Sequence, residues 1–163
     1  MPRAFIGMGG NLGDPERTLR WALDELAART VLRRRARLYG SAPWGPPGQP
    51  DYLNTVVELD TNRDPYVLLD ALKAIERDSG RTATVHWGPR TLDLDLLCYE
   101  SEVVRTARLQ LPHPGIAKRP FVLAPWADLM PELVLPGQTQ SIGALWADLG
   151  AAPDELWVVE DVV

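Results

Sequence analysis

Two aspartates separated by a single residue are the feature of this sequence with the clearest chemical use. Asp93 and Asp95 lie in residues 91–96, where polar residues alternate with three leucines. Alternate side chains of a strand point to opposite faces, so both carboxylates are expected on one face and the leucines in the core. With their backbones ~7 Å apart, the two carboxylates can converge on one or two hard cations.

Basic residues close to these aspartates suit the phosphates of a nucleotide. Arg81, His86 and Arg90 come shortly before Asp93. Magnesium prefers few carboxylates together with waters and substrate phosphate oxygens, and arginine pairs well with phosphate. Two ions held in this way would clamp a triphosphate and activate an attacking oxygen. We therefore predict an enzyme that transfers a phosphate-type group from magnesium-bound ATP. An amphipathic strand with one wet face is the alternative.

A loop rich in proline and glycine, residues 41–50, begins the second group of candidate residues. Trp44 and Tyr52 offer flat apolar faces, and Asn54 offers a donor and an acceptor side by side. Such an amide can pair with the edge of a planar nitrogen heterocycle while aromatic rings stack on its face. Ordinary packing with a turn asparagine explains the same residues, and the sequence leaves both interpretations open.

Three further features carry weaker signals. In the glycine-rich residues 7–13, Leu12 stands where a dinucleotide-binding turn needs its third glycine, so a tight strand-to-helix turn is predicted. His113 lies between two prolines, where a rigid turn could present it to a phosphate oxygen, and a structural role is the alternative. Cys98 is an even number of residues from Leu92, Leu94 and Leu96, so in a regular strand it points to the same face as these leucines. We therefore predict that Cys98 is buried beside them and unreactive.

Hydrophobic periodicity predicts the elements that position these residues. Aspartate caps a helix and proline suits its first position, so helices are expected to open at Asp14 and Asp64. The second of them should end near Gly80. Strands are expected at about residues 3–8, 31–39, 53–60 and 91–99. The order β-α-β-β-α-β is the ferredoxin-like split βαβ, an α+β fold with two helices on one face of an antiparallel sheet.

The remaining third of the chain is expected to cover the other face of the sheet, so that helices lie on both faces. Short strands are predicted near residues 103–104 and 109–111, and helical pieces near 116–119 and 142–149. The tail at about 151–163 contains an apolar run that fits either an added edge strand or a contact surface. The sequence does not decide between these two.

Length and composition narrow the class of protein. The chain has 163 residues and 18.1 kDa, which predicts a single domain over residues 1–163. No apolar run reaches the ~20 residues of a membrane helix, and one cysteine excludes a disulfide framework, so we expect a cytoplasmic protein. A net charge of −5 argues against nucleic acid as a partner. Small molecules are the expected partners, and a monomer is the expected state.

Taken together, these segments resemble the 6-hydroxymethyl-7,8-dihydropterin pyrophosphokinase family of folate biosynthesis. The resemblance spans about residues 3–135, and the run WGPRTLDLD is its most specific part. Its motifs are GMGGNLG at 7–13, PWGP at 43–46, QPDYLN at 49–54, WGPRTLDLD at 87–95, PHP at 112–114 and RPFVL at 119–123. The resemblance implies a ferredoxin-like fold and transfer of pyrophosphate from ATP to the pterin hydroxymethyl group, with AMP and the pterin diphosphate as products.

The resemblance also implies roles for individual residues. Asp93 and Asp95 would ligate two magnesium ions, with Asp95 nearest the attacking hydroxyl, while Arg81 and Arg90 would neutralise the triphosphate. These four form the implied catalytic set. The residues implied around ATP are Lys73, Glu76, Trp87, Arg90, Leu96, Arg108, Gln110, His113 and Arg119. The residues implied around the pterin are Ser41, Ala42, Trp44, Tyr52, Asn54, Asp93 and Phe121.

The sequence departs from relatives near the expected ATP site. The loop at residues 82–86 is about one residue shorter than in some bacterial relatives and lacks their second arginine after Arg81, which could weaken ATP affinity. Gly10, His86 and Pro114 also stand where other residues are common. The loops at 82–86 and 41–50 are the candidates for lids that exclude water.

Three other functions fit parts of this sequence. An RNA-binding module shares the strand order, but it would carry a basic surface and aromatics where Asp93 and Asp95 stand. A ligand-sensing domain without catalysis would explain a pocket but not carboxylates beside arginines. An enzyme with the same site that acts on another heterocyclic alcohol stays open.

Overall fold

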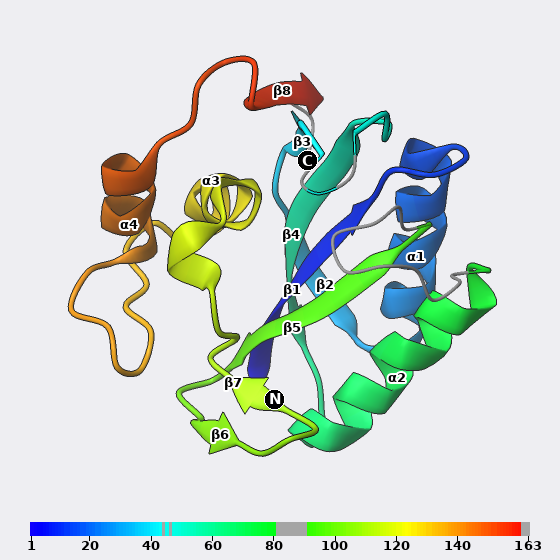
Figure 1. Cartoon of the computed structure of the whole chain (residues 1–163). Helices are drawn as coiled ribbons and strands as arrows, with labels where there is room; N and C mark the ends of the chain where they lie inside the picture. The colour runs from blue at the N-terminus through cyan, green and yellow to red at the C-terminus, as the bar shows by residue number, and fades with distance from the viewer. Residues whose placement is uncertain (44, 46, 81–90, 161–163) are drawn as a thin grey trace.

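The computed structural model describes residues 1–43, 45, 47–80 and 91–160 (Figure 1). The ferredoxin-like core has the predicted order of elements. They are β1 (Arg3–Gly10), α1 (Pro15–Arg29), β2 (Val31–Arg35), β3 (Leu38–Ser41), β4 (Tyr52–Asp60), α2 (Pro65–Asp78) and β5 (Asp93–Tyr99). The rest of the described chain forms β6 (Val104–Arg105), β7 (Gln110–Leu111), the 3-10 helix η1 (Ile116–Lys118), α3 (Pro120–Leu129), α4 (Ile142–Leu149) and β8 (Leu156–Glu160).

One antiparallel sheet organises the molecule. Its strand order is β5-β1-β4-β3-β8, and β2 also pairs with β4. The single strand predicted over residues 31–39 is therefore two strands along the same edge of β4. The break lies at Ala36, whose N–H still donates to the carbonyl of Val56 at 2.9 Å. Counting β2 and β3 as one strand, the order is that of the predicted split βαβ fold.

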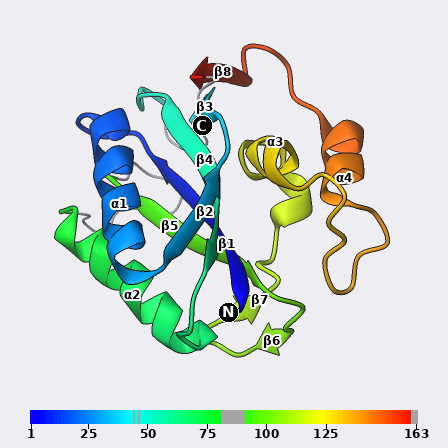
Figure 2. The same ribbon diagram turned by 180° about the vertical axis from the view of Figure 1, so that it is seen from behind.

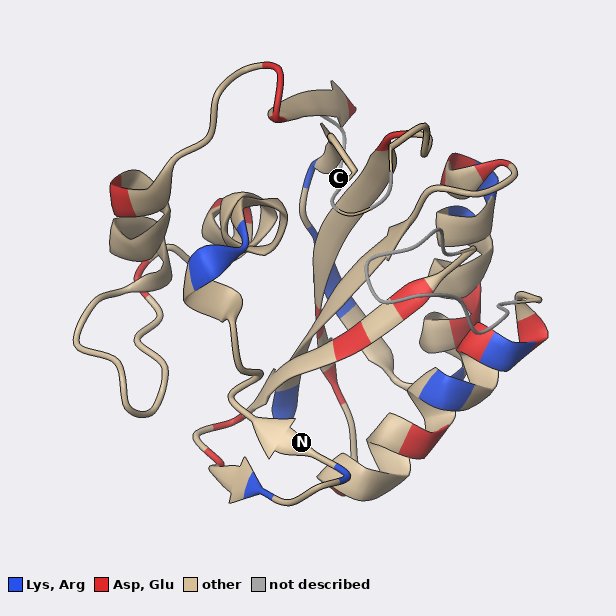
Figure 3. Ribbon diagram, in the orientation of Figure 1, with Lys and Arg blue, Asp and Glu red and all other residues tan. Residues whose placement is uncertain are grey.

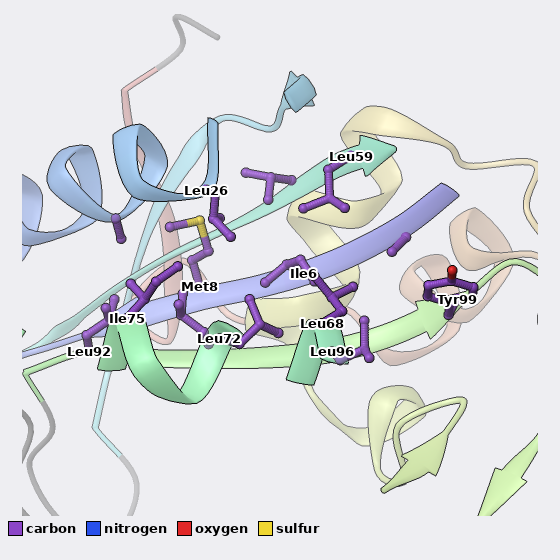
Figure 4. Close-up of a cluster of buried hydrophobic side chains, with 14 of the residues drawn as sticks. Ile6, Met8, Leu26, Leu59, Leu68, Leu72, Ile75, Leu92, Leu96 and Tyr99 are labelled. Carbon is purple, nitrogen blue, oxygen red and sulfur yellow. The ribbon is translucent and has the colours of Figure 1, made fainter. Parts of the chain in front are cut away.

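Helices α1 and α2 cover one face of the sheet. Both predicted caps are present, because the Asp14 side chain accepts from the N–H of Arg17 and the Asp64 side chain accepts from the two N–H groups of Tyr66 and Val67. The helices bury their apolar stripes against β1, β4 and β5, in the cluster shown in Figure 4. This cluster fixes which face of β5 points away from α1 and α2, and therefore where the aspartates lie.

Helix α3 covers the opposite face, and α4 packs against α3 on the side away from the sheet, as Figures 1 and 2 show. Their buried residues pack on Phe5, Val56 and Leu97 of the sheet. Helical segments at η1 and α4 were predicted from the sequence, and α3 was not. Helix α3 is buried on nearly all sides and contains Pro125, so it lacks the amphipathic period that identifies a helix.

A bulge in β5 corrects the prediction for Cys98. Ile6 of β1 pairs with Leu96 and Phe5 pairs with Cys98, so Leu97 is an extra residue. Leu96 therefore packs towards α1 and α2, whereas Leu97 and Cys98 both pack towards α3 and α4. The predicted burial of Cys98 is confirmed, and the predicted face is wrong.

We expect Cys98 to be unreactive in the folded protein. Burial raises the pKa of its thiol to about 12, so almost no thiolate forms at neutral pH. A disulfide reagent at pH 8 should therefore label it no faster than the chain unfolds. Labelling within seconds, as for an exposed thiol, would contradict the described burial.

Within the tail, Leu156–Glu160 form one of the two predicted structures, an edge strand. β8 pairs antiparallel with β3, from Ser41 opposite Leu156 to Leu38 opposite Glu160. Within the described ranges, no helix has the length and apolar character needed to cross a membrane.

Candidate active site

Asp93 and Asp95 lie on the face of β5 that points away from α1 and α2. Both are half-buried, while Leu92, Leu94 and Leu96 between and beside them are at most 3% exposed. The predicted alternation is confirmed along this part of β5. The acidic segments of the strand are visible in Figure 3.

Glycines of β1 lie directly beside the two carboxylates. Asp95 pairs with Gly7 and Asp93 pairs with Gly9. Residues that pair directly across strands present their side chains on the same face. Asp93 and Asp95 therefore stand beside a stretch of β1 that carries no side chains on this face.

Asn54 stands on the far side of Gly9, on β4. Gly9 pairs with Asn54, and the Asn54 amide donates to the hydroxyl of Ser41 on β3 at 2.8 Å. Ser41 and Asn54 are 4% and 6% exposed. Asp93, Gly9 and Asn54 thus form a row across three adjacent strands on one face, and Ser41 of the next strand joins it through the Asn54 amide. Two carboxylates at one end and a buried amide with a hydroxyl at the other suit a charged group joined to a polar heterocycle.

Replacing Gly9 with alanine should disturb this row. The added methyl group would lie 2.7 Å from the Asn54 side-chain oxygen, closer than real contacts allow. We expect Gly9→Ala to displace the Asn54 amide and to weaken binding of a heterocyclic ligand about tenfold, which isothermal titration would measure. Gly137→Ala, in the loop before α4, controls for backbone strain alone: its φ of 82° is unfavourable for alanine, but nothing lies within 4 Å of the new methyl group. Unchanged affinity for Gly9→Ala would contradict the described packing.

Two aromatic residues approach this row from different elements. Tyr52 pairs with Ser41, so its ring lies on the same face. Phe121 begins α3 and packs against Tyr39, Ala124 and Leu156. Ala42 follows Ser41 directly, and Trp44 lies outside the described residues.

Sequence reasoning missed two anchors of this region. Asn11 is 2% exposed and donates its amide to the carbonyl of Pro50, which ties the glycine turn to the loop at 41–50. The Tyr39 hydroxyl contacts the Asp128 carboxylate at 2.9 Å, which ties β3 to α3. Burial raises the pKa of Tyr39 to about 12, so it stays a neutral donor. A polar residue inside the glycine-rich turn was the one signal available for Asn11, and Tyr39 had none.

Glu76 of α2 holds the aspartate segment from the other side. Its carboxylate is 3% exposed and accepts from the N–H of Leu94 at 2.8 Å. β5 is an edge of the sheet, so this outward N–H needs a partner from outside the sheet. The second Glu76 oxygen pairs with Lys73 at 3.2 Å. Glu76 thus fixes the residue that stands between Asp93 and Asp95.

The other residues implied around ATP lie beyond β5. Gln110 lines a cavity of about 510 Å³ beside the β6–β7 hairpin. His113 donates its backbone N–H to Leu97 of β5 at 2.8 Å, and Arg108 pairs with Asp70 of α2. Arg119 is half-buried just before α3. Arg81, Trp87 and Arg90, together with the predicted lid at 82–86, lie outside the described residues.

The carboxylates of Asp93 and Asp95 fit a magnesium ion that is also bound by phosphate oxygens. In the described part of the chain, no group of three or more His, Cys, Asp or Glu is placed to hold a metal. Two hard carboxylates beside a side-chain-free strand leave coordination positions for phosphate oxygens and water, which magnesium prefers.

Comparison with known proteins places the chain in a family. Residues 5–131 match the family model described as 7,8-dihydro-6-hydroxymethylpterin-pyrophosphokinase (HPPK). The 2-amino-4-hydroxy-6-hydroxymethyldihydropteridine pyrophosphokinase of Pseudomonas aeruginosa is 46% identical over 136 residues, which cover 82% of this chain and 84% of that protein. The protein of the same name from Methylorubrum extorquens is 42% identical over 141 residues, covering 85% and 89%.

A solved structure supports the same fold. Plasmodium falciparum HPPK-DHPS with pteroate superposes with a TM-score of 0.75 at 12% identity and covers 90% of this chain. This chain spans 44% of that longer protein, so the likeness shows the fold alone. With most of its length matched by one family model and by proteins of one name, the chain belongs to the 7,8-dihydro-6-hydroxymethylpterin-pyrophosphokinase family.

Proposed function

We propose that this protein transfers the pyrophosphate group of ATP to the hydroxymethyl oxygen of 6-hydroxymethyl-7,8-dihydropterin in folate biosynthesis. The products are AMP and the pterin diphosphate. The observation that carries the proposal is the row across the sheet in which Asp93 and Asp95 stand at one end and Asn54 with Ser41 at the other. Family membership supports the reaction and ATP as the co-substrate.

The two aspartates hold the reacting phosphates in this proposal. Asp93 and Asp95 ligate two magnesium ions, which neutralise phosphate charge and polarise the β-phosphorus when bound. Asp95 is nearest the attacking hydroxyl and orients it, and Asp93 also borders the pterin. Arg81 and Arg90 stabilise the charge that develops on the triphosphate. The proposed reaction passes through no covalent intermediate, so catalysis rests on positioning and electrostatics.

The pterin lies beside the glycines of β1 in this proposal. Asn54 pairs with the heterocycle edge, supported by its hydrogen bond to Ser41. The aromatic rings of Tyr52 and Phe121 stack on its faces, and Trp44 and Ala42 complete the pocket. Closure of the loops at 41–50 and 82–86 would exclude water and prevent simple ATP hydrolysis.

ATP extends from the aspartates towards the outer edge of β5. The Leu96 side chain is buried at 3% exposure, so its proposed contact falls to the backbone. The backbone N–H and carbonyl of Leu96 point away from β1, because Leu96 is two residues after Leu94, whose N–H points out of the sheet towards Glu76. The remaining proposed ATP contacts are Lys73, Glu76, Trp87, Arg108, Gln110, His113 and Arg119.

We also propose that the protein works as a cytoplasmic monomer and that residues 1–163 form one domain. One six-stranded sheet, with α1 and α2 on one face and the packed pair α3 and α4 on the other, supports the single domain.

One assay tests the reaction. The protein is mixed with magnesium, ATP and 6-hydroxymethyl-7,8-dihydropterin, and the nucleotide product is measured. AMP that forms only with the pterin is the expected result. ADP as the product would indicate an ordinary kinase, and absence of turnover would favour a ligand-sensing domain. Activity only with another heterocyclic alcohol would identify a different substrate. Each of these three outcomes would overturn the proposal.

A further inference from the structure

Residues 155–160 lie outside the segment that matches the family model, yet they attach directly to the pterin side of the proposed site. The strand β8 borders β3, which carries Ser41. The Ala42 N–H, at the start of the loop at 41–50, donates to the carbonyl of Glu155 at 3.1 Å. The backbone hydrogen bonds between β3 and β8 therefore continue up to the residue at which the loop at 41–50 leaves the sheet.

A buried side chain provides a second attachment. Leu156 is 8% exposed and packs with Tyr39 and Ala124, and Phe121 lies against this group. Phe121 is the residue of α3 that is proposed to stack on the pterin. Leu156 thus belongs to the group against which Phe121 packs, while its backbone pairs with Ser41.

The close approach of β8 to β3 depends on Gly40. A methyl group at this position would lie 2.3 Å from the indole nitrogen of Trp157. Trp157 therefore lies directly over the backbone of the residue before Ser41. This contact needs a glycine in β3. The pairing shifts register between Leu38 and Tyr39, where Val159 is an extra residue of β8.

An ion pair network holds the far end of β8. Glu160 contacts Arg35 of β2 at 3.1 Å and Arg20 of α1 at 2.9 Å. These contacts lower the pKa of Glu160, with the Arg35 hydrogen bond as the largest cause. The strand is thus fastened to the core at one end and to the loop at the other.

We propose that residues 155–160 are a positioning element for the pterin, which holds Ser41, Ala42 and Phe121 in their binding arrangement. The inference rests on the proposed function. Leu156 and Glu160 are positioning residues, because they act through these three and do not touch the substrate. The segment borders the pterin side of the site and not the outer edge of β5, so it should affect pterin and leave ATP unaffected.

The test compares Leu156→Ala with Leu135→Ala. Leu135 is buried at 4% exposure against α3 and α4 but is not part of the group around Tyr39, so it is a matched truncation. Two readouts are taken for each: the KM values for both substrates, and the Kd of the pterin, from its fluorescence, in the presence of magnesium and α,β-methylene-ATP. Leu156→Ala should raise the pterin KM and Kd about tenfold, with kcat and the ATP KM within about twofold of wild type.

A surface variant guards against loss of folding. Glu160→Gln removes the charge that pairs with Arg35 and Arg20 without opening the core, and should raise the pterin Kd about threefold. Unchanged pterin constants in both variants, or equal weakening of pterin and ATP binding, would overturn the inference. So would an equal effect of Leu135→Ala. Absence of pterin-dependent AMP formation in the wild type would instead reject the proposed function itself.

Discussion

Asp95→Ala is expected to lower AMP formation by roughly a thousandfold or more at saturating substrates, because it removes a proposed ligand of the magnesium ions that would stabilise the transferring phosphates. The fold should survive. Asp95 is half-buried on the open face of β5, and the leucines on the other face form the core. Circular dichroism and thermal unfolding should therefore resemble those of wild type.

A matched control for this substitution lies on α1. Asp24 is an exposed carboxylate on that helix, away from β5. Asp24→Ala should leave turnover within about twofold of wild type, as expected for a surface site. If Asp95→Ala kept near-normal turnover, the metal-ligand role would be wrong.

Glu76→Leu is the second substitution with a large expected effect. It removes the acceptor of the buried Leu94 N–H, which should cost about 2 kcal/mol of unfolding free energy. For a chain of this size that corresponds to a fall of roughly 4–8 °C in Tm. The segment carrying Asp93 and Asp95 would also loosen, so the magnesium concentration for half-maximal turnover should rise about tenfold.

Glu76→Gln separates geometry from charge. The glutamine carbonyl oxygen can still accept from Leu94, so stability and magnesium dependence should stay much closer to wild type than in Glu76→Leu. Calorimetry and magnesium titration of the two variants measure both effects. Equal behaviour of glutamine and leucine at this position would show that the hydrogen bond to Leu94 does not matter.

The parts of the fold that depend on local pattern could be predicted from the sequence. The caps Asp14 and Asp64 and the alternation around Asp93 are local signals, and each is confirmed. The bulge at Leu97 is not local, because it arises from pairing with β1, and it moved Cys98 to the other face. Helix α3 was missed because burial on nearly all sides removes the periodic signal.

The site could be predicted only in part for a similar reason. Period-two alternation places Asp93 and Asp95 together, but the row that joins them to Asn54 depends on the registers of β1 with β4 and β5. The bond from Glu76 to Leu94 joins a helix to an edge strand and has no sequence pattern. The cation-binding role of Asp93 and Asp95 is predicted from their spacing, the other ligand roles are implied by resemblance to the family, and all of them stay predictions.

The central claim is that Asp93 and Asp95 hold the divalent ions that carry the nucleotide. A crystal structure with magnesium, α,β-methylene-ATP and 6-hydroxymethyl-7,8-dihydropterin tests it most directly. The account predicts a carboxylate oxygen of each aspartate at about 2.1 Å from a magnesium ion that also binds phosphate oxygens. Magnesium bound only by phosphate, water or other carboxylates, with Asp93 and Asp95 turned away from it, would contradict the account.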